Sequence, residues 1–224
     1  MKYIFSIIVA LFIVQNAGAQ GISAGLRTGV GNTLDITSVK DGVKHNYWEK
    51  QLFLRYETSG RLAFEINSTQ YRYSYHEEPI IWDCTFVPPT HETVDIEVTH
   101  RNIDFGLSAQ YDLSCPFLQE RCPLMKNFKN YIGLTAKSGL NERTDIYTSR
   151  ALSDGNITED RTQHRYVDGI HLGINHTTKY TFGRFYLTST ATVTVNPWDL
   201  GSFAPAAYNE NSRLSLRIGA GYRL

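Results

Sequence analysis

The feature that most constrains this sequence is an alternation of apolar and polar residues that persists through almost all of it after residue 20. A period of two is typical of β-strands with one apolar and one polar face. The clearest case is the segment 102–112, in which Ile103, Phe105, Leu107, Ala109 and Tyr111 share one face. The pattern predicts eight strands, at residues 21–31, 51–57, 62–67, 102–112, 132–137, 165–175, 184–193 and 213–224.

Eight alternating strands favour a closed antiparallel barrel, because closure removes the edges that an open sheet must protect. Alternation alone fits two kinds of barrel. A lipocalin-like barrel turns its apolar face inward around a ligand, whereas a transmembrane barrel turns the same face outward against lipid. The charges and the aromatic residues favour the second kind. We therefore predict an all-β fold, an eight-stranded antiparallel up-and-down transmembrane β-barrel.

The polar face of the predicted strands carries charges of both signs, together with many glycines. The interior of an eight-stranded barrel is narrow and filled by side chains, so opposite charges can pair there. Glycines on the same face leave room for these long side chains. We predict a lumen charge network formed by Arg27, Arg55, Glu57, Glu65, Asp104, Lys137, Arg184 and Arg217.

Aromatic residues fall at matching heights at the two ends of the predicted strands. If the first strand runs outward from the periplasm, the inner belt comprises Tyr56, Tyr111, Phe185 and Tyr222. The outer belt comprises Trp48, Trp82 and Trp198. Two aromatic belts around an apolar band are typical of a membrane interface, although strands are also enriched in aromatics generally.

The predicted connections differ on the two sides of the barrel. Residues 32–46, 77–92, 141–160 and 196–211 form long polar outer loops, and residues 59–60, 114–127 and 176–182 form inner turns. Cys115 and Cys122 lie in the second inner turn, where an oxidising periplasm would allow a local disulfide, and Cys84 is left over in an outer loop. The spacing of Cys and His fits no zinc site, so we predict neither a metal nor a cofactor.

The first 19 residues have the pattern of an export signal. Met1 and Lys2 precede an apolar run at residues 3–14 and the small residues Ala17, Gly18 and Ala19. The run is shorter than the roughly twenty residues that a membrane-spanning helix needs. We predict a signal peptide at residues 1–19, the alternative being an uncleaved anchor. Residues 20–224 would then form a barrel domain in the cell outer membrane.

Several segments resemble the PorT-like outer-membrane β-barrel domain family. Gly21-Ile-Ser-Ala-Gly-Leu-Arg is similar to that family's opening strand, and Asn102-Ile-Asp-Phe-Gly-Leu-Ser-Ala-Gln-Tyr to its central strand. Asn130-Tyr-Ile-Gly-Leu resembles a later strand, and Leu216-Arg-Ile-Gly-Ala-Gly-Tyr-Arg-Leu its closing motif. The last residue is Leu224, where the family usually ends in the Phe read by the barrel-insertion machinery. The resemblance implies a fold and an outer-membrane location, but no chemistry.

With 22 basic and 22 acidic residues, the chain lacks the basic excess of a nucleic-acid-binding protein. We predict a small outer-membrane barrel without enzymatic activity, with a structural, adhesive or accessory envelope role exerted through its surface loops. Its expected partners are outer-membrane lipid and lipopolysaccharide, the barrel-insertion machinery, and an unidentified envelope or surface partner. The alternatives are a lipocalin-like carrier of an apolar ligand and an outer-membrane lipid A-modifying hydrolase, in which His176 would activate Thr178.

Overall fold

The protein is built of antiparallel strands. The computed structural model describes residues 21–34, 45–58, 60–77, 91–115, 122, 125–151, 155–167, 169–197 and 212–224. The strands are β1 (Gly21–Leu34), β2 (His45–Glu57), β3 (Leu62–Glu77), β4 (His91–Asp112), β5 (Phe128–Ala151), β6 (Ile157–Val167), β7 (His171–Phe182), β8 (Phe185–Val195) and β9 (Ser212–Arg223). A short 3-10 helix, η1 (Met125–Asn127), precedes β5. In these ranges no helix has the length and apolar character needed to cross a membrane. The predicted signal peptide, Trp82, Cys84 and Trp198 lie outside the described residues.

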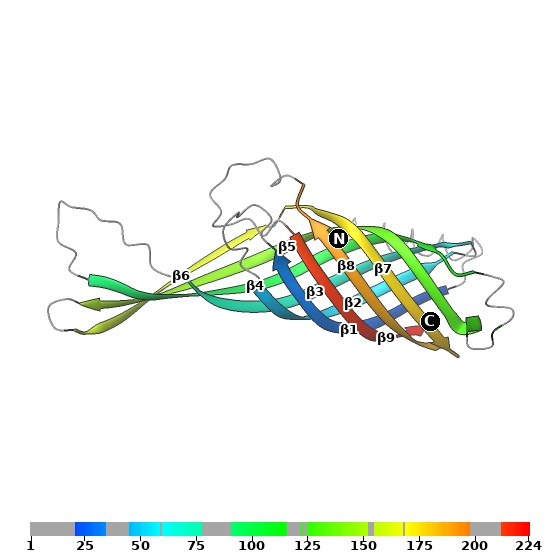
Figure 1. Ribbon diagram of the computed structural model, residues 1–224, viewed down its shortest axis with the longest axis horizontal. Coiled ribbons are helices and arrows are strands. Elements are labelled where there is room, and N and C mark those ends of the chain that lie inside the picture. Colours follow the sequence, from blue (N-terminus) through cyan, green and yellow to red (C-terminus); the bar gives the residue numbers. More distant parts are fainter. Residues whose placement is uncertain are drawn as a thin grey trace, which may run out of the picture.

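Eight of the strands close into a ring. The order around the sheet is β4-β3-β2-β1-β9-β8-β7-β5, and β5 pairs back onto β4, so each of these strands has two neighbours (Figure 1). The pairs are antiparallel throughout. β6 pairs with β5 and stands outside the ring. The predicted fold, an eight-stranded antiparallel barrel, is confirmed.

Apolar and polar side chains occupy opposite faces of the barrel wall. Large apolar side chains point outward and are exposed, for example Leu52 on β2 and Leu134 on β5. Their neighbours along the strands, such as Gln51 and Thr135, are polar and buried in the lumen. An exterior of this kind is suited to lipid. The lipocalin-like alternative is wrong, because it requires the apolar face to line the interior.

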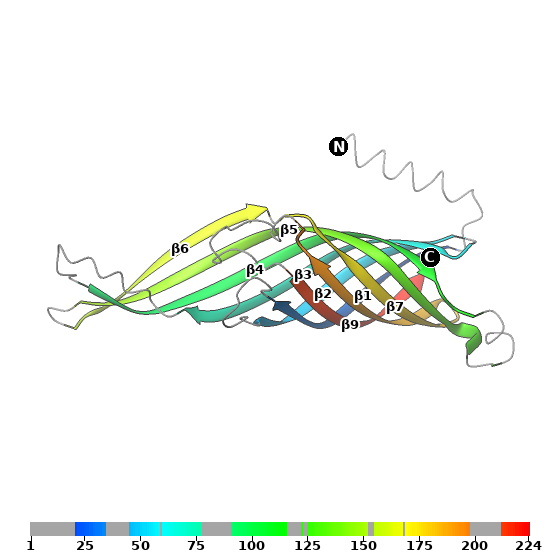
Figure 2. The same cartoon turned by 45° about the horizontal axis from the view of Figure 1, so that its top comes forward.

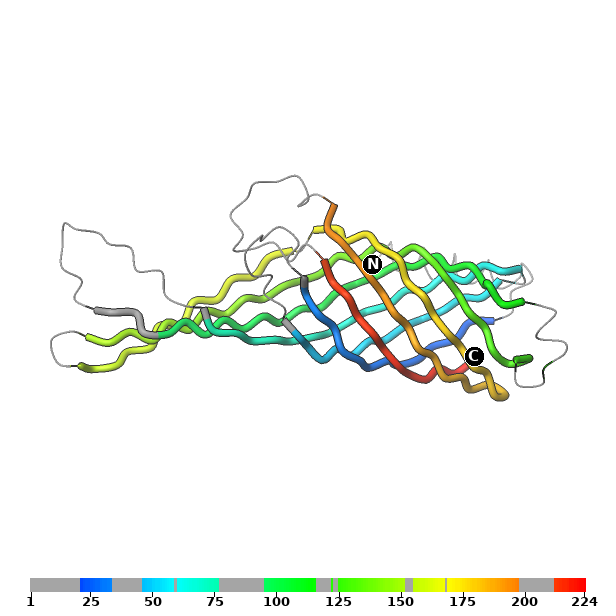
Figure 3. Tube along the Cα trace, in the orientation of Figure 1, coloured from blue at the N-terminus to red at the C-terminus, as the bar shows by residue number. Residues whose placement is uncertain are grey.

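Two barrel strands continue far beyond the ring. β4 has 22 residues and β5 has 24, against 11 to 14 in β1, β2, β7, β8 and β9. Their far halves pair with each other, and β6 pairs along the far half of β5. These strands extend away from one end of the barrel (Figures 1 and 2), and the Cα trace follows both long strands without a break from the barrel outward (Figure 3). We call residues 91–101, 141–151 and 157–167 the projecting sheet.

Two predictions about this region are wrong. Residues 141–160, predicted as an outer loop, contain the end of β5 and the start of β6. The single strand predicted at 165–175 is two strands, because β6 ends at Val167 and β7 begins at His171. The two errors have different causes. Beyond Leu140, β5 has no lipid-facing side, so its sequence lacks the alternation from which strands were predicted. In residues 165–175 the alternation continues from β6 into β7, so it did not mark where one strand ends and the next begins.

The inner turn between β7 and β8 is shorter than predicted. Residues 176–182 belong to β7, and Phe182 pairs with Phe185 across a two-residue turn. The turn begins at Gly183, whose φ of +65° favours glycine. The predicted lumen position of Arg184 is wrong, because this residue completes the turn and is exposed. Its guanidinium donates to the Tyr222 hydroxyl at 3.3 Å.

Candidate functional site

The lumen contains the other seven residues of the predicted charge network. Each is at most 8% exposed: Arg27, Arg55, Glu57, Glu65, Asp104, Lys137 and Arg217. Among the other buried charged side chains, Glu49, Lys179 and Arg213 form ion pairs with members of this network. Lys179 was missed because it lies in the predicted inner turn 176–182, and Glu49 because the second strand was predicted to begin only at residue 51. Extending the same period of two by a few residues would have found both.

At the inner end of the barrel an ion pair crosses the lumen. Lys179 Nζ donates to Glu57 Oε1 at 2.6 Å, and Arg55 Nε donates to the same oxygen at 2.9 Å. Glu57 lies on β2 and Lys179 on β7, which are four strands apart in the ring of eight and therefore face each other. Aromatic rings cover both cations, Tyr131 at 4.2 Å from Arg55 and Tyr186 at 4.3 Å from Lys179.

The next layer is held by a two-pronged ion pair. Arg27 donates to both carboxylate oxygens of Glu65, at 2.5 and 2.7 Å, and to the side-chain oxygen of Gln51 at 2.8 Å. The guanidinium of Arg55 approaches the same carboxylate at 3.4 Å. Glu65 therefore compensates two buried cations. Charges are retained at such depth only when they are paired and hydrogen-bonded.

A second ion pair crosses the lumen toward the outer end. Arg213 on β9 donates to Asp104 on β4 at 2.9 Å, and these strands are also four apart in the ring. Arg217 Nε lies 3.3 Å from Glu49 Oε1, and Arg217 donates to the Thr192 hydroxyl at 2.5 Å. Two ion pairs that cross the lumen at different heights obstruct a path along the barrel axis.

Buried aromatic rings pack against one another beyond these ion pairs, toward the outer end. Tyr47 and Tyr71 stack with their centroids 4.4 Å apart, and Tyr73 stacks on His100 at 4.8 Å. All four are buried. Sequence reasoning missed this cluster, because the third strand was predicted to end at residue 67. The run Tyr71-Arg-Tyr-Ser-Tyr, with three tyrosines on one strand face, carries the signal that could have found it.

Glycines on the lumen face make room for these rings. A Cβ atom at Gly31 would lie 2.1 Å from the Tyr47 ring, and one at Gly221 would lie 2.3 Å from the Tyr186 ring. Contacts this short cannot be relieved by rotating a rigid ring against a packed wall. The alternation of glycine with apolar residues, as in the last strand, therefore reflects the width of the filled interior.

On the exterior, the four aromatics predicted for the inner belt lie at the strand ends beside the inner turns. Phe185 and Tyr111 are exposed, and Tyr56 and Tyr222 are half-buried. Phe185 packs edge-on against Tyr222, with ring centroids 5.0 Å apart. Trp48 is exposed on the exterior of β2, toward the other end of the barrel.

Cys115 and Cys122 are free in the structure, which does not contain the local disulfide that the sequence allowed. Proximity in sequence does not bring two Cβ atoms to the separation of about 4 Å that the bond needs. The described residues contain no cluster of three or more His, Cys, Asp or Glu side chains able to hold a metal ion.

The two residues of the hydrolase alternative lie on the exterior face of β7. His176 is exposed, and the Thr178 hydroxyl is half-buried and donates to Asn130 Oδ1 at 3.0 Å. The hydroxyl that would act as nucleophile is therefore engaged with the neighbouring strand.

The projecting sheet presents polar side chains to solvent. Nine of the eleven residues of β6 are exposed, and one edge of this strand has no neighbour among the described strands. Glu142 accepts hydrogen bonds from Gln163 at 2.5 Å and from Arg165 at 3.0 Å. Desolvation raises the pKa of the Glu142 carboxyl, but these two hydrogen bonds and the charge of Arg165 outweigh it and hold the pKa below its ordinary value.

No protein-family model matches this chain, and no curated protein matches it in sequence. Solved structures do resemble it. The chain is 14% identical to Neisserial surface protein A, with a TM-score of 0.52, covering 92% of this chain and 99% of that one. It is 12% identical to Ail of Yersinia pestis, crystallised with the heparin analogue sucrose octasulfate, with a TM-score of 0.42 and coverages of 92% and 100%.

The N-terminal β-barrel domain of Pseudomonas aeruginosa OprF is 11% identical, with a TM-score of 0.40. The match covers 92% of this chain and 99% of that domain. At 14% identity the first likeness concerns the fold alone, and the other two are too distant to add to it. The chain thus has the fold of small outer-membrane β-barrel proteins. Its resemblance to the PorT-like family stays a prediction.

Proposed function

We propose that this chain is an integral outer-membrane protein that does not conduct and that makes contacts at the cell surface through its projecting sheet. The observation that carries the contact role is the length of β4 and β5, which extend a polar three-stranded sheet beyond the barrel. A membrane protein that needed only an anchor would have strands of about 9–11 residues. The apolar exterior supports the location, together with the export signal predicted at residues 1–19.

The location is tested by the gel mobility of the protein in isolated envelopes, with and without boiling. We expect a heat-dependent shift and recovery in the outer-membrane fraction, because a closed barrel resists detergent until its strands are separated. A protein found in the soluble periplasm with no shift would refute the proposal.

The absence of conduction is supported by the ion pairs Glu57–Lys179 and Asp104–Arg213, which join opposite walls. In planar bilayers we expect no steady open current from the refolded protein. The double variant Lys179→Ala/Arg213→Ala, checked for its heat shift, is the matched comparison, and it should conduct at least intermittently. A large steady conductance of the unmodified protein would overturn this part.

The contact role is tested by shortening the projecting sheet. Replacing residues 144–163 by Asn-Gly joins Arg143 to His164, which are paired partners in β5 and β6. Cells with equal amounts of the intact or shortened barrel in the outer membrane are compared for aggregation and for adhesion to surfaces. We expect cells with the intact barrel to aggregate and adhere more than cells without it, and cells with the shortened form to show no such increase. Equal behaviour of the two would refute the contact role and leave the barrel in place.

We also propose that the chain is not an enzyme. The engagement of Thr178 with Asn130, on a face exposed to lipid, supports this for the hydrolase alternative. Expression of the protein should leave the acylation of lipid A unchanged. A changed profile that reverts with His176→Ala would instead establish the hydrolase.

A further inference from the structure

A single row of large side chains crosses the exterior at the base of the projecting sheet. Trp48 on β2 pairs with Arg72 on β3, Arg72 with Arg101 on β4, Arg101 with Glu142 on β5, and Glu142 with Arg165 on β6. Cross-strand partners have Cβ atoms about 5 Å apart, so these five side chains are direct neighbours. Lys50 lies on the same face, two residues along β2 from Trp48.

The row carries more positive charge than it can compensate. Its acidic member, Glu142, is bound by Arg165 and Gln163. Arg72 and Arg101 stand directly opposite each other, and neither forms a salt bridge within the described part of the chain; Arg101 also lies opposite Glu142 and acts on it through its charge, which helps to lower the pKa of that carboxyl. Like charges in this position destabilise a sheet. The pair of guanidinium groups is therefore suited to an anion that lies between them.

On β4, β5 and β6 the row also marks the boundary of the apolar exterior. The next positions toward the inner end on these strands are Ile103, Leu140 and Val167, which are paired with one another and exposed, whereas on β2 and β3 they are the polar pair Lys50 and Gln70. The next positions outward are uncharged and polar, with Ser74 and Thr99 hydrogen-bonded at 2.9 Å. The cations thus lie where an apolar surface meets a polar one, which is the level of lipid headgroups.

The height of the row agrees with this assignment. On β4, Arg101 is ten residues from Tyr111 in the inner aromatic belt. At about 3.4 Å per residue and the usual strand tilt, the two are roughly 25 Å apart along the barrel axis, close to the thickness of the apolar band of outer-membrane barrels.

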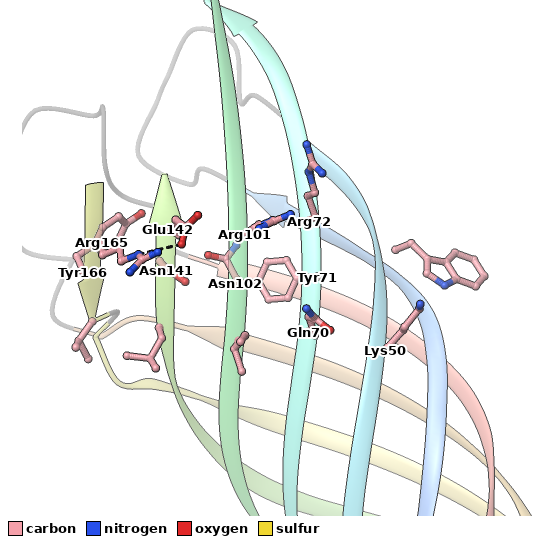
Figure 4. A pocket seen from close by; sticks show the side chains of 14 residues that line it. Lys50, Gln70, Tyr71, Arg72, Arg101, Asn102, Asn141, Glu142, Arg165 and Tyr166 are labelled. Atoms are coloured by element: carbon pink, nitrogen blue, oxygen red, sulfur yellow. Dashed lines mark hydrogen bonds and ion pairs between the residues drawn. The ribbon is translucent and has the colours of Figure 1, made fainter. Parts of the chain in front are cut away.

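A groove occupies this place. Its volume is about 940 Å³. It is lined by the row described above, which we call the basic row, by the apolar residues Ile103, Leu140 and Val167, and by residues that lie between these two sets along the strands (Figure 4). The labelled side chains come from β2 through β6, and the dashed line joins Glu142 to Arg165. Its size is in the range of small-molecule binding sites.

We propose that this groove binds a phosphorylated acyl lipid of the outer leaflet, of the lipid A class. Phosphate oxygens lie between Arg72 and Arg101, whose planar guanidinium groups donate two hydrogen bonds each, with Lys50 and Arg165 adding charge at the sides. Acyl chains lie along Ile103, Leu140 and Val167. The proposal rests on the proposed membrane location and gives one expected lipid partner a defined site.

The test uses the full mature chain refolded into phosphatidylcholine nanodiscs. Bis-phosphorylated lipid A is titrated in, and the bound lipid is measured by native mass spectrometry. Arg72→Gln/Arg101→Gln should bind at least tenfold more weakly than the unmodified chain. The matched control is Arg150→Gln/Arg161→Gln, which removes the same charge from the projecting sheet and should stay within twofold.

Two further titrations identify the ligand. Dephosphorylated lipid A should bind at least tenfold more weakly, and millimolar inorganic phosphate should not displace the lipid. An equal loss in the control variant, equal binding of the dephosphorylated lipid, or displacement by free phosphate would each overturn the proposal.

The heat-dependent mobility shift of each variant separates this outcome from a failure of the proposed function. If the chain is not a barrel in lipid, the unmodified protein lacks the shift. If only the site is wrong, the shift remains and the lipid preference is absent. If the double variant does not fold, Arg72→Gln and Arg101→Gln are measured singly, and a loss below twofold in both overturns the proposal.

Discussion

β4 and β5 run through both the barrel wall and the projecting sheet, yet their side chains follow different rules in the two regions. In the wall, β5 exposes apolar side chains such as Leu134 to the outside and buries polar ones such as Thr135. Beyond Leu140 the same strand has no apolar side, and its partner β6 is exposed along almost its whole length. The wall has neighbours on both edges of each strand, whereas β6 has one.

The difference shows that strand formation and alternation are separate properties. Backbone pairing holds β4 and β5 together along both regions. Alternation follows where one face meets lipid and the other meets the filled lumen, and it is lost on β5 and β6 beyond Leu140, where the side chains on both faces are mostly polar. Substitutions should therefore change stability much more in the barrel wall than in the projecting sheet.

The largest effect is expected from Glu65→Gln, which removes the carboxylate shared by Arg27 and Arg55. Leaving buried cations without their partner costs about 3–5 kcal/mol. The free energy of unfolding, measured by urea titration in phospholipid vesicles, should fall by this amount. Glu159→Gln on exposed β6 is the control and should change it by less than about 0.5 kcal/mol. Similar values for the two would contradict the description of the lumen.

The next largest effect on stability distinguishes the exterior of the barrel from the surface of the projecting sheet. Leu134 and Ile157 are both highly exposed apolar residues, one on the barrel and one on β6. Leu134→Arg should cost about 2–4 kcal/mol in vesicles, because a charge is driven into the apolar band. Ile157→Arg should be close to neutral, because water already surrounds it. If both substitutions were neutral, the exterior of the barrel would not face lipid.

A smaller effect is expected from deleting the far part of the projecting sheet. The barrel ring does not depend on β6, so replacing residues 144–163 by Asn-Gly should preserve the heat-dependent mobility shift. We expect its unfolding midpoint in urea to remain near that of the intact chain. Loss of the shift would mean that the projecting sheet is needed to build the barrel.

The smallest effect concerns the acid response at the base of the projecting sheet. The folded-state pKa of Glu142 is lowered, so its contribution to stability is present above its ordinary pKa and is lost as the pH falls through the folded value. Arg165→Gln should move the pKa of Glu142 back up. NMR titration of the Glu142 carboxyl in micelles measures this, and an unchanged pKa would show that the ion pair does not form.

The barrel could be predicted from the sequence because its physical causes are local. Each side chain on one face of a strand must suit lipid, and the next one must fit the lumen. The polarity of a residue therefore indicates which face of the barrel wall it occupies. Seven of the eight predicted charges are buried in the lumen for this reason. The prediction for Arg184 was wrong because this residue lies in a two-residue turn. The position of that turn is set by Gly183, and it decides whether the next residue points inward or outward.

The pairings within the lumen could not be predicted. Lys179 meets Glu57 and Arg213 meets Asp104 because the ring places β7 opposite β2 and β9 opposite β4, which depends on the closure of the whole sheet. The projecting sheet was also missed: β6 and the far part of β5 lack alternation, and the short alternating run Val94-Asp-Ile-Glu-Val on β4 was assigned to no strand. The basic row could not be predicted for a third reason. Its members lie on five strands, β2 to β6, and only the pairing register of these strands makes them neighbours.

The continuity of β4 and β5 has a mechanical consequence. The two strands are paired from His91 and Ala151 at the tip to Asp112 and Tyr131 inside the barrel, with one irregularity between Thr93 and Asp95. Tension on the tip therefore runs along the strands and loads their hydrogen bonds together, in shear. A loop would bend where it leaves the barrel, whereas these two strands stay hydrogen-bonded to each other along the whole projecting sheet. A partner bound at the tip would therefore stand away from the barrel by the length of these paired strands, and a pull on it would reach the barrel wall.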